Sequence, residues 1–279
     1  MRINIILRSL QKSARREFEY HYRISMQSFL YSILNDSPFD EVKQIHDTED
    51  KVSPFCFSDI RGKFGPEGNL YDNPELCSDP KKDRYQIIIS TPKKEVGMTL
   101  LMKFNELIRE KPELNLKMSR FLIEEVTPQQ IQIHSGDILC SDTPIVLSNF
   151  EKSEGVPRYV LFGEHRVLAK NCVEDPKLFI SALEKNLARK IIKLGIKETS
   201  IVSNFEITRM EKHWKATIPL FELQNGKPYF VIGSRVRIKL KEDCLRESIE
   251  AINTLFDTGF GAYNSYGMGF MMKEVHKHA

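Results

Sequence analysis

The sequence Thr258-Gly-Phe-Gly-Ala-Tyr-Asn-Ser-Tyr-Gly-Met-Gly-Phe270 lies near the carboxyl end of the chain and holds four of its fourteen glycines. These are Gly259, Gly261, Gly267 and Gly269, which form two Gly-X-Gly pairs around a polar and aromatic centre. Glycine adopts positive φ angles readily and lets another group approach the backbone closely. We therefore expect a tightly turned loop whose amide groups form a nest for phosphate. The structural alternative is a helix C-cap followed by a flexible turn, for which one glycine would suffice.

The segments on either side of the loop exclude two common kinds of nucleotide-binding site. Apolar residues at helical spacing precede it, and a short apolar strand from Met268 to Val275 follows it. The helical residues are Leu245, Ile249, Ile252 and Phe256. Walker and dinucleotide-binding loops place their glycines ahead of a helix, and the Walker loop also needs a following lysine. Neither condition is met here, so a nucleoside triphosphate or NAD site is not expected.

The rest of the carboxyl-terminal half predicts strands and helices in a recognisable order. A strand pair precedes a helix, two more strands follow, and a second helix leads into the glycine loop and the final strand. The expected elements are strands near Glu125–His134 and Ile145–Ser148, a helix from Asp175-Pro176 to Gly195, strands near 203–221 and 229–240 with a hairpin turn at Asn225-Gly226, and a helix over Lys241–Phe256. This order is a βαββαβ unit.

The amino-terminal half predicts the same order. The expected elements are a strand over Arg2–Arg8, a helix over 16–34, a helical turn over 39–45, strands over 55–60 and 85–90, a helix over 95–109 and a strand over 114–123. The predicted fold class is therefore α+β, with two tandem ferredoxin-like (RRM-like) domains whose antiparallel sheets carry helices on one face. We expect the domains to cover residues 1–124 and 125–279.

Composition limits the class of protein. The 279 residues are 41% hydrophobic and 28% charged, which is typical of a soluble globular protein. No apolar run approaches the roughly 20 residues that span a bilayer, and the amino terminus is predicted to be a strand, so we expect a cytoplasmic protein without membrane contact. The five cysteines form no Cys-X-X-Cys pair. No metal site, disulfide framework or cofactor is expected.

The segment Ser234–Lys241 alternates between basic and apolar residues. Arg235, Arg237, Lys239 and Lys241 share one predicted strand face, and Val236, Ile238 and Leu240 share the other. Like charges along one face repel each other, and contacts with the phosphates of an anionic partner would offset that repulsion. The alternative is a solvated face with acidic residues on the neighbouring strands. The net charge of only +3 is modest for a nucleic-acid binder, so such binding would depend on local clusters of basic residues.

The glycine pattern resembles the signature of the CRISPR-associated repeat-RNA endoribonucleases, members of the RAMP superfamily that cut precursor CRISPR RNA. Gly259-Phe260-Gly261 and Gly267-Met268-Gly269, separated by five residues, match it. The resemblance, with the basic strand, implies RNA contacts by Gly259, Gly261, Asn264, Ser265, Gly267, Gly269, Arg235, Arg237, Lys239 and Arg23. It also implies the tandem ferredoxin-like fold, with the catalytic residues in the first domain and the glycine loop in the second.

Similarity to family members that cut with Tyr, His and Lys points to Tyr31, His46 and Lys51. His46 would act as general acid or base, because its pKa lies near neutrality. Tyr31 would orient or deprotonate the 2′-hydroxyl, and Lys51 would stabilise charge on the phosphorane. Without the resemblance, His46 would be a surface histidine and Tyr31 an aromatic residue at the edge of the core. His21 on the first predicted helix is a rival acid or base.

The function that the resemblance implies is metal-independent cleavage of the repeat segments of precursor CRISPR RNA. The products would carry 2′,3′-cyclic phosphate and 5′-hydroxyl ends. The alternative is a non-catalytic RNA-binding RAMP subunit of a CRISPR effector complex. A tandem RRM protein outside CRISPR systems is less favoured, because the aromatic RNP pattern is missing from the sequence. The expected partner is repeat RNA, and the sequence leaves open other effector subunits and a homodimer.

Overall fold

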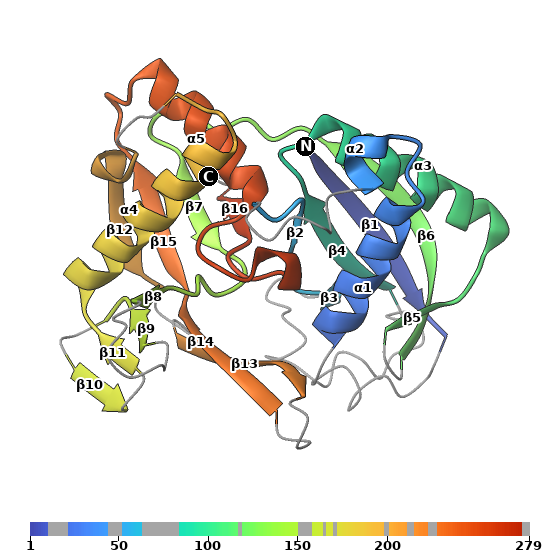
Figure 1. Ribbon diagram of the computed structural model, residues 1–279, viewed down its shortest axis with the longest axis horizontal. Coiled ribbons are helices and arrows are strands. Elements are labelled where there is room, and N and C mark those ends of the chain that lie inside the picture. Colours follow the sequence, from blue (N-terminus) through green and yellow to red (C-terminus); the bar gives the residue numbers. More distant parts are fainter. Residues whose placement is uncertain are drawn as a thin grey trace, which may run out of the picture. The chain divides into compact units, whose positions relative to one another are not determined.

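The computed structural model divides into two compact units, coloured along the sequence in Figure 1. The first unit comprises residues 1–130 and 219–229, and the second comprises residues 131–218 and 230–279. The structure describes residues 1–10, 22–43, 52–62, 84–116, 119–149, 158–163, 166–169, 172–197, 201–210, 215–222 and 228–274. The boundary expected at residue 124 lies inside a strand of the first unit, β6 (Ser119–Gln129).

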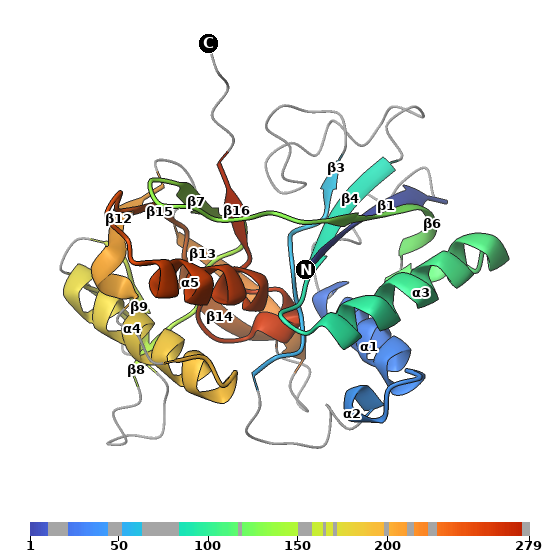
Figure 2. The ribbon, with the colours of Figure 1, turned by 90° about the horizontal axis from the view of Figure 1, so that it is seen from above.

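The first unit has the predicted ferredoxin-like topology. Its elements are β1 (Arg2–Ser9), α1 (Tyr22–Asn35), α2 (Asp40–Lys43), β2 (Cys56–Phe57), β3 (Arg61–Gly62), β4 (Arg84–Ser90), α3 (Lys94–Glu110), β5 (Leu114–Leu116) and β6. The sheet order is β2-β4-β1-β6-β5, with β3 also paired to β4. Both α1 and α3 lie on one face of this sheet (Figure 2). The single strand expected over 114–123 is instead a hairpin of β5 and β6.

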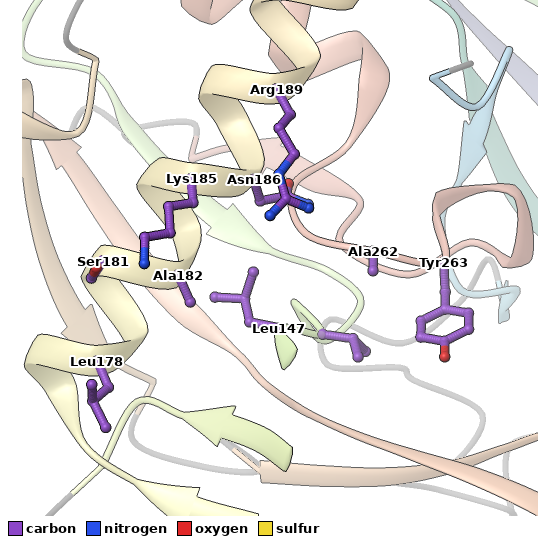
Figure 3. Close-up of a pocket in the computed structure, with 10 residues that line it drawn as sticks. Leu147, Leu178, Ser181, Ala182, Lys185, Asn186, Arg189, Ala262 and Tyr263 are labelled. Carbon is purple, nitrogen blue, oxygen red and sulfur yellow. The ribbon is translucent and has the colours of Figure 1, made fainter. Parts of the chain in front are cut away.

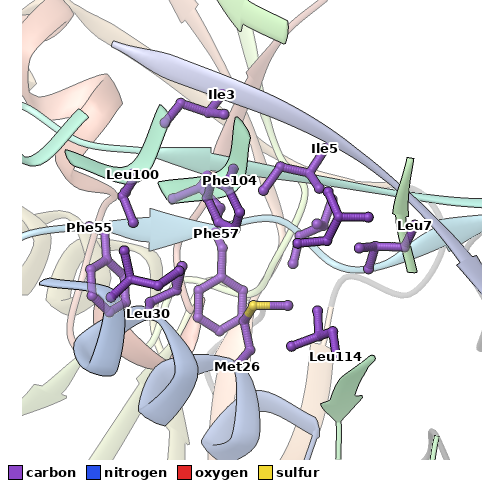
Figure 4. Packing of buried hydrophobic residues seen from close by; sticks show 14 of the residues in the cluster. Ile3, Ile5, Leu7, Met26, Leu30, Phe55, Phe57, Leu100, Phe104 and Leu114 are labelled. Carbon is purple, nitrogen blue, oxygen red and sulfur yellow. The ribbon is translucent and has the colours of Figure 1, made fainter. Parts of the chain in front are cut away.

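The core of the first unit lies between the sheet and these helices (Figure 4). Ile3, Ile5 and Leu7 of β1 alternate along the strand and contribute to this core. The predicted apolar stripe of α1 is confirmed, because Met26 and Leu30 are buried in the same cluster. The strand register against β6 shifts between Ile6 and Leu7, where the alternation of the sequence is also broken. This core fixes α1 and therefore the position of Tyr31 on it.

The second unit repeats the topology. Its elements are β7 (Ile138–Ser141), β8 (Ser148–Asn149), β9 (Arg158–Leu161), β10 (Arg166–Ala169), β11 (Cys172–Glu174), α4 (Pro176–Lys193), β12 (Phe205–Arg209), β15 (Val236–Leu240), α5 (Arg246–Thr258) and β16 (Met271–Lys273). Two further strands, β13 (Lys215–Glu222) and β14 (Pro228–Ser234), are divided between the units, because residues 219–229 belong to the first. The main sheet has the order β12-β15-β7-β16 and carries α4 and α5 on one face (Figure 2). The strands β8 to β11 form a second sheet, and β13 pairs with β14.

Two predicted strands of this half are wrong in position. Residues 125–129 of the expected strand 125–134 belong to β6, which pairs with β1 of the first sheet as far as Gln129. The first strand of the second main sheet is β7, after a turn in which Gly136 has φ 78°. The expected strand 145–148 is reduced to β8 and to isolated bridges from Ile145 to Ser234 and from Val146 to Ala262. Hydrophobic alternation alone did not distinguish strands from these bridged loops.

The two helices of the second unit differ in how well the sequence located them. Asp175 caps α4 as predicted, since its side chain accepts hydrogen bonds from the backbone N–H groups of Lys177 and Leu178. The predicted helix over Lys241–Phe256 begins later, at Arg246, and Leu245 is 67% exposed instead of lying on the apolar face. The hairpin turn expected at Asn225-Gly226 lies outside the described residues. Across the described ranges, no helix is both long and apolar enough to cross a membrane.

Candidate nucleic-acid interface

The glycine loop joins α5 to β16, and its backbone requires the glycines. Gly259, Gly261, Gly267 and Gly269 have φ angles of 84°, 77°, 74° and 69°. Side chains other than glycine adopt this region rarely. A Cβ atom at Gly261 would lie 2.7 Å from the carbonyl oxygen of Val146, and one at Gly269 would collide with the backbone of Phe260. The expectation of a tightly turned loop is confirmed.

The amide groups of the loop are mostly engaged inside the protein, which corrects the expectation of a phosphate nest. Phe260 N donates to Gly269 O at 2.8 Å, and Gly269 N donates to Pro144 O at 2.9 Å. Ala262 N donates to Val146 O at 2.9 Å, and Gly267 N donates to the Asn264 carbonyl at 2.7 Å. The glycines therefore serve first to seat the loop against residues 144–146. Contact of the loop with RNA remains a proposal about its exposed surface.

A buried lysine on α4 is hydrogen-bonded to the loop. Lys190 is 7% exposed, and its Nζ donates to Gly259 O and to Asn264 Oδ1, each at 2.6 Å. The Asn264 amide in turn donates to the carbonyl oxygens of Phe260 and Met268. Asn264 is itself only 5% exposed. The Asn264 side chain therefore fixes the loop, and its contact with RNA stays a prediction.

The centre of the loop presents aromatic rings. Residues Asn264–Tyr266 form a short 3-10 turn, preceded by Tyr263 in the left-handed region at φ 59° and ψ 32°. The rings of Tyr263 and Tyr266 meet edge to face with centroids 6.3 Å apart. Ser265 lies between these two tyrosines in the sequence. Its side chain is half-buried and stays a candidate RNA contact. The groups of the loop that a ligand could contact are therefore mainly side chains, because most backbone amides are bonded within the protein.

The basic strand has the predicted alternation. Val236, Ile238 and Leu240 are buried, while Arg237 and Lys239 are exposed, and Arg235 is half-buried just before β15. Acidic residues also lie on the neighbouring strands, as the alternative interpretation required. Arg237 contacts Glu274 at 2.8 Å, and Lys239 lies opposite Glu206 in the register of β12 and β15. RNA would therefore have to compete with an exposed and weak ion pair at Arg237.

The same face carries a cysteine with little nucleophilic character. Cys140 of β7 lies opposite Arg237 in the strand register, and its Sγ lies 3.7 Å from Glu274 Oε2. Burial, and then the negative charge of Glu274, raise the pKa of the Cys140 thiol to about 11. The thiol is therefore protonated at neutral pH and is not a reactive nucleophile.

In the first unit, Arg23 has a structural role. Its side chain is 2% exposed and pairs with Asp59, and the Tyr22 hydroxyl donates to the same carboxylate at 3.0 Å. The guanidinium group also lies 5.9 Å from the centroid of the Phe57 ring. This conformation leaves almost none of the Arg23 side chain accessible, and its contact with RNA stays a prediction.

The predicted catalytic residues are only partly visible. Tyr31 is half-buried on α1, with its ring 5.1 Å from that of Phe55. This placement fits an aromatic residue at the edge of the core as well as a catalytic one. His46, Lys51 and the rival His21 lie outside the described residues. Their roles stay predictions.

The structure adds two residues that sequence reasoning missed, Asp59 and Lys190. Lys190 carries a detectable signal, since it interrupts the apolar side of α4 beside Leu187 and Ile191. A lysine in such a position is either extended to solvent or paired internally. Asp59 follows a short apolar segment and carries no comparable pattern.

Comparisons with known proteins agree with this architecture. Residues 126–272 match the family model described as "CRISPR associated protein Cas6, C-terminal". The CRISPR-associated endoribonuclease Cas6 2 of Methanocaldococcus jannaschii is 24% identical over 250 residues, covering 88% of this chain and 90% of that protein. A Cas6-related protein from Pyrococcus furiosus has the same fold, with a TM-score of 0.66, 18% identity and 99% of each chain covered. A RAMP protein described as binding different RNA substrates superposes with a TM-score of 0.66 at 15% identity, covering 99% of this chain and 100% of that one.

Proposed function

Because this chain belongs to the Cas6 family of CRISPR-associated proteins, we propose that it is an endoribonuclease that cuts the repeat segments of precursor CRISPR RNA. The observation that carries the proposal is the family match over residues 126–272, which includes α4, the basic strand and the glycine loop. The relative from Methanocaldococcus jannaschii, named as an endoribonuclease, supports the same activity over most of the chain.

The proposed reaction uses the RNA's own 2′-hydroxyl as nucleophile. The hydroxyl loses its proton and its oxygen attacks the adjacent phosphorus. The bond from phosphorus to the 5′-oxygen breaks, and the leaving oxygen gains a proton. The products are a 2′,3′-cyclic phosphate and a 5′-hydroxyl, so the step needs proton transfer and charge stabilisation.

The residues proposed for this chemistry are Tyr31, His46 and Lys51. His46 would protonate the leaving 5′-oxygen or act as base, since an imidazole titrates near neutral pH. Tyr31 would orient the 2′-hydroxyl, and its position on a helix held by a packed core favours a fixed geometry. Lys51 would stabilise the negative charge of the phosphorane.

RNA binding is proposed for the surface of the second unit. The exposed cations Arg237 and Lys239, together with Arg235, would contact phosphates. The glycine loop would approach the RNA backbone closely at Gly259, Gly261, Gly267 and Gly269, and Ser265 would add a hydroxyl donor. In this proposal Asn264 and Lys190 hold the loop in shape.

The test is incubation of the protein with end-labelled cognate repeat RNA in EDTA. We expect wild-type protein to cut at one site and to leave a cyclic-phosphate end. The His46→Ala variant should cut roughly a hundredfold or more slowly, as loss of a proton-transfer group typically gives. His134→Ala is the matched control, because His134 is exposed in the second unit and should not change the rate.

The other outcomes assign the alternatives. Cutting that depends on added Mg²⁺ would contradict the proposed mechanism. If His46→Ala cuts normally while His21→Ala does not, the catalytic histidine is His21. Wild-type protein that binds the repeat tightly and never cuts it would instead be the non-catalytic RNA-binding subunit.

A further inference from the structure

A cavity of about 430 Å³ lies within the second unit, between α4 and the centre of the glycine loop (Figure 3). This volume is in the range of about 300–1,000 Å³ found for sites that bind small molecules. Its lining includes residues of α4, of the segment after β7 and of the loop: Leu147, Lys185, Asn186, Arg189, Ala262 and Tyr263. The cavity therefore adjoins the loop proposed to bind RNA.

Two cations border the cavity. Lys185 and Arg189 are exposed and one helical turn apart on α4, so they lie on the same side of the helix. Within the described part of the chain, neither has a carboxylate within ion-pair distance. Like charges at this spacing destabilise a helix slightly. A bound phosphate group would relieve that repulsion.

The opposite wall is apolar and aromatic. Leu147 and Ala262 line it, and Tyr263 stands at its edge (Figure 3). Tyr263 has φ 59°, which is unusual for a bulky residue and persists only where its surroundings enforce it. Here the Tyr263 carbonyl accepts hydrogen bonds from Tyr266 N and Met268 N. Such strained residues concentrate at ligand-binding sites.

A polar group on the wall has unused hydrogen-bonding capacity. Asn186 lies between Lys185 and Arg189 in the lining of the cavity, and its Oδ1 is buried with no hydrogen-bond partner. Buried polar atoms without partners are few in folded proteins. An amide can both donate and accept hydrogen bonds, so Asn186 offers a polar group to a ligand in the cavity.

We propose that this cavity holds one unstacked nucleotide of the bound RNA. Its base would pack against Leu147 and the Tyr263 ring, its edge would hydrogen-bond to the Asn186 amide, and its phosphate would lie between Lys185 and Arg189. Single-stranded RNA is commonly recognised in this way, by stacking of a splayed base together with phosphate contacts. The inference rests on the proposed function, and it names the residues that would make this protein prefer one repeat over another.

A free nucleotide would present the same base and phosphate to the same residues. The two sources differ in what else the protein touches, because an RNA chain also reaches the glycine loop and the basic strand. Repeat RNA should therefore bind far more tightly than any free nucleoside monophosphate.

The first measurement compares RNA affinity across salt concentrations. The double variant Lys185→Ala/Arg189→Ala should bind repeat RNA at least roughly tenfold more weakly, and the slope of log K against log salt should become shallower by about one. The matched control is Lys177→Ala/Lys197→Ala, which removes the same charge from exposed positions outside the cavity. It should leave the slope nearly unchanged. Thermal unfolding should show that all of these proteins are folded.

The second measurement locates the base. Tyr263→Leu should weaken RNA binding roughly tenfold, because base stacking on an aromatic ring is lost, while Tyr263→Phe should bind like wild type. Repeat RNAs carrying 4-thiouridine at single positions should crosslink to Tyr263 or α4 from one position only. Substituting that base should change affinity in wild type and not in Asn186→Ala.

The outcomes separate this inference from the proposed function. If wild type cuts the repeat and the cavity variants match their controls, the cavity is not a nucleotide site while the function stands. If wild type neither binds nor cuts repeat RNA, both fail. If AMP, CMP, GMP or UMP alone binds in the cavity more tightly than repeat RNA, the occupant is a free nucleotide and the inference is overturned.

Discussion

Among the described residues, each unit has one buried cation on a helix, Arg23 in the first and Lys190 in the second, and the two have different roles. In the first unit, Arg23 of α1 pairs with the Asp59 carboxylate inside the core, next to the Phe57 ring. In the second unit, Lys190 of α4 reaches two neutral oxygens of the glycine loop, Gly259 O and Asn264 Oδ1. The first cation fastens a helix to the core that supports Tyr31. The second fastens a helix to the loop that we propose contacts RNA.

This difference shows how one topology can separate stability from function. Removing a buried ion pair's partner leaves a charge in a low-dielectric core, which destabilises the whole unit. Removing a lysine that supports a loop leaves unsatisfied carbonyl and amide groups at one edge of the unit. We therefore expect variants of Arg23 to affect unfolding first and variants of Lys190 to affect RNA binding as well.

The largest effect is expected for Arg23→Ala. Because Asp59 would remain buried without its cation, the variant should lose about 3–5 kcal/mol of unfolding free energy in urea titrations. Arg120→Ala is the control, since its pair with Glu113 is exposed on both sides and should contribute less than about 1 kcal/mol. Equal losses of unfolding free energy for the two substitutions would show that the buried pair contributes no more to stability than the exposed one.

The next effect concerns the loop backbone. Gly269→Ala should destabilise the protein by about 2–4 kcal/mol, since it adds both a positive-φ penalty and a collision with Phe260. Gly195→Ala has nearly the same φ, 68°, and open space around the added Cβ, so it should lose only about 1–2 kcal/mol. The difference between the two measures the collision alone. If they are equal, the loop accommodates a side chain and is not tightly seated.

Lys190→Met should come third in stability, at about 1.5–3 kcal/mol, because two charge-assisted hydrogen bonds are lost. It should also weaken repeat-RNA binding by misplacing the loop. Lys177→Met, on the exposed first turn of α4, is the control for both measurements. Normal RNA affinity in a destabilised Lys190→Met protein would contradict the link between this lysine and the loop's function.

The smallest change in stability is expected for Arg237→Ala/Lys239→Ala. These side chains are exposed, so unfolding free energy should change by less than about 1 kcal/mol. RNA affinity should nevertheless fall, with a shallower salt dependence, if the basic strand contacts phosphates. Arg246→Ala, which removes an exposed charge paired with Glu250 on α5, should leave RNA affinity unchanged.

The sequence predicted the topology because periodicity and capping are local. The alternation of β15, the apolar stripe of α1 and the Asp175 cap each follow from residues close together in the chain. The roles of Arg23 and Asn264 depend instead on distant partners. Arg23 pairs with Asp59, 36 residues away in the sequence, and Asn264 bonds to Lys190, 74 residues away. A basic or amide side chain near a functional motif looks the same whether it is exposed or buried. Only the tertiary contacts decide between a ligand for RNA and a support for the fold.

The discontinuous first unit has a consequence for shuffling parts between relatives. Residues 219–229 belong to that unit although they lie within the sequence of the second. A chimera made with a single crossover near residue 130 would take residues 1–130 from one parent and residues 219–229 from the other. Its first unit would therefore be a mixture of the two parents. Exchanging one complete unit needs three junctions, at residues 130, 218 and 229. Recombination between relatives is therefore not expected to exchange the two units independently.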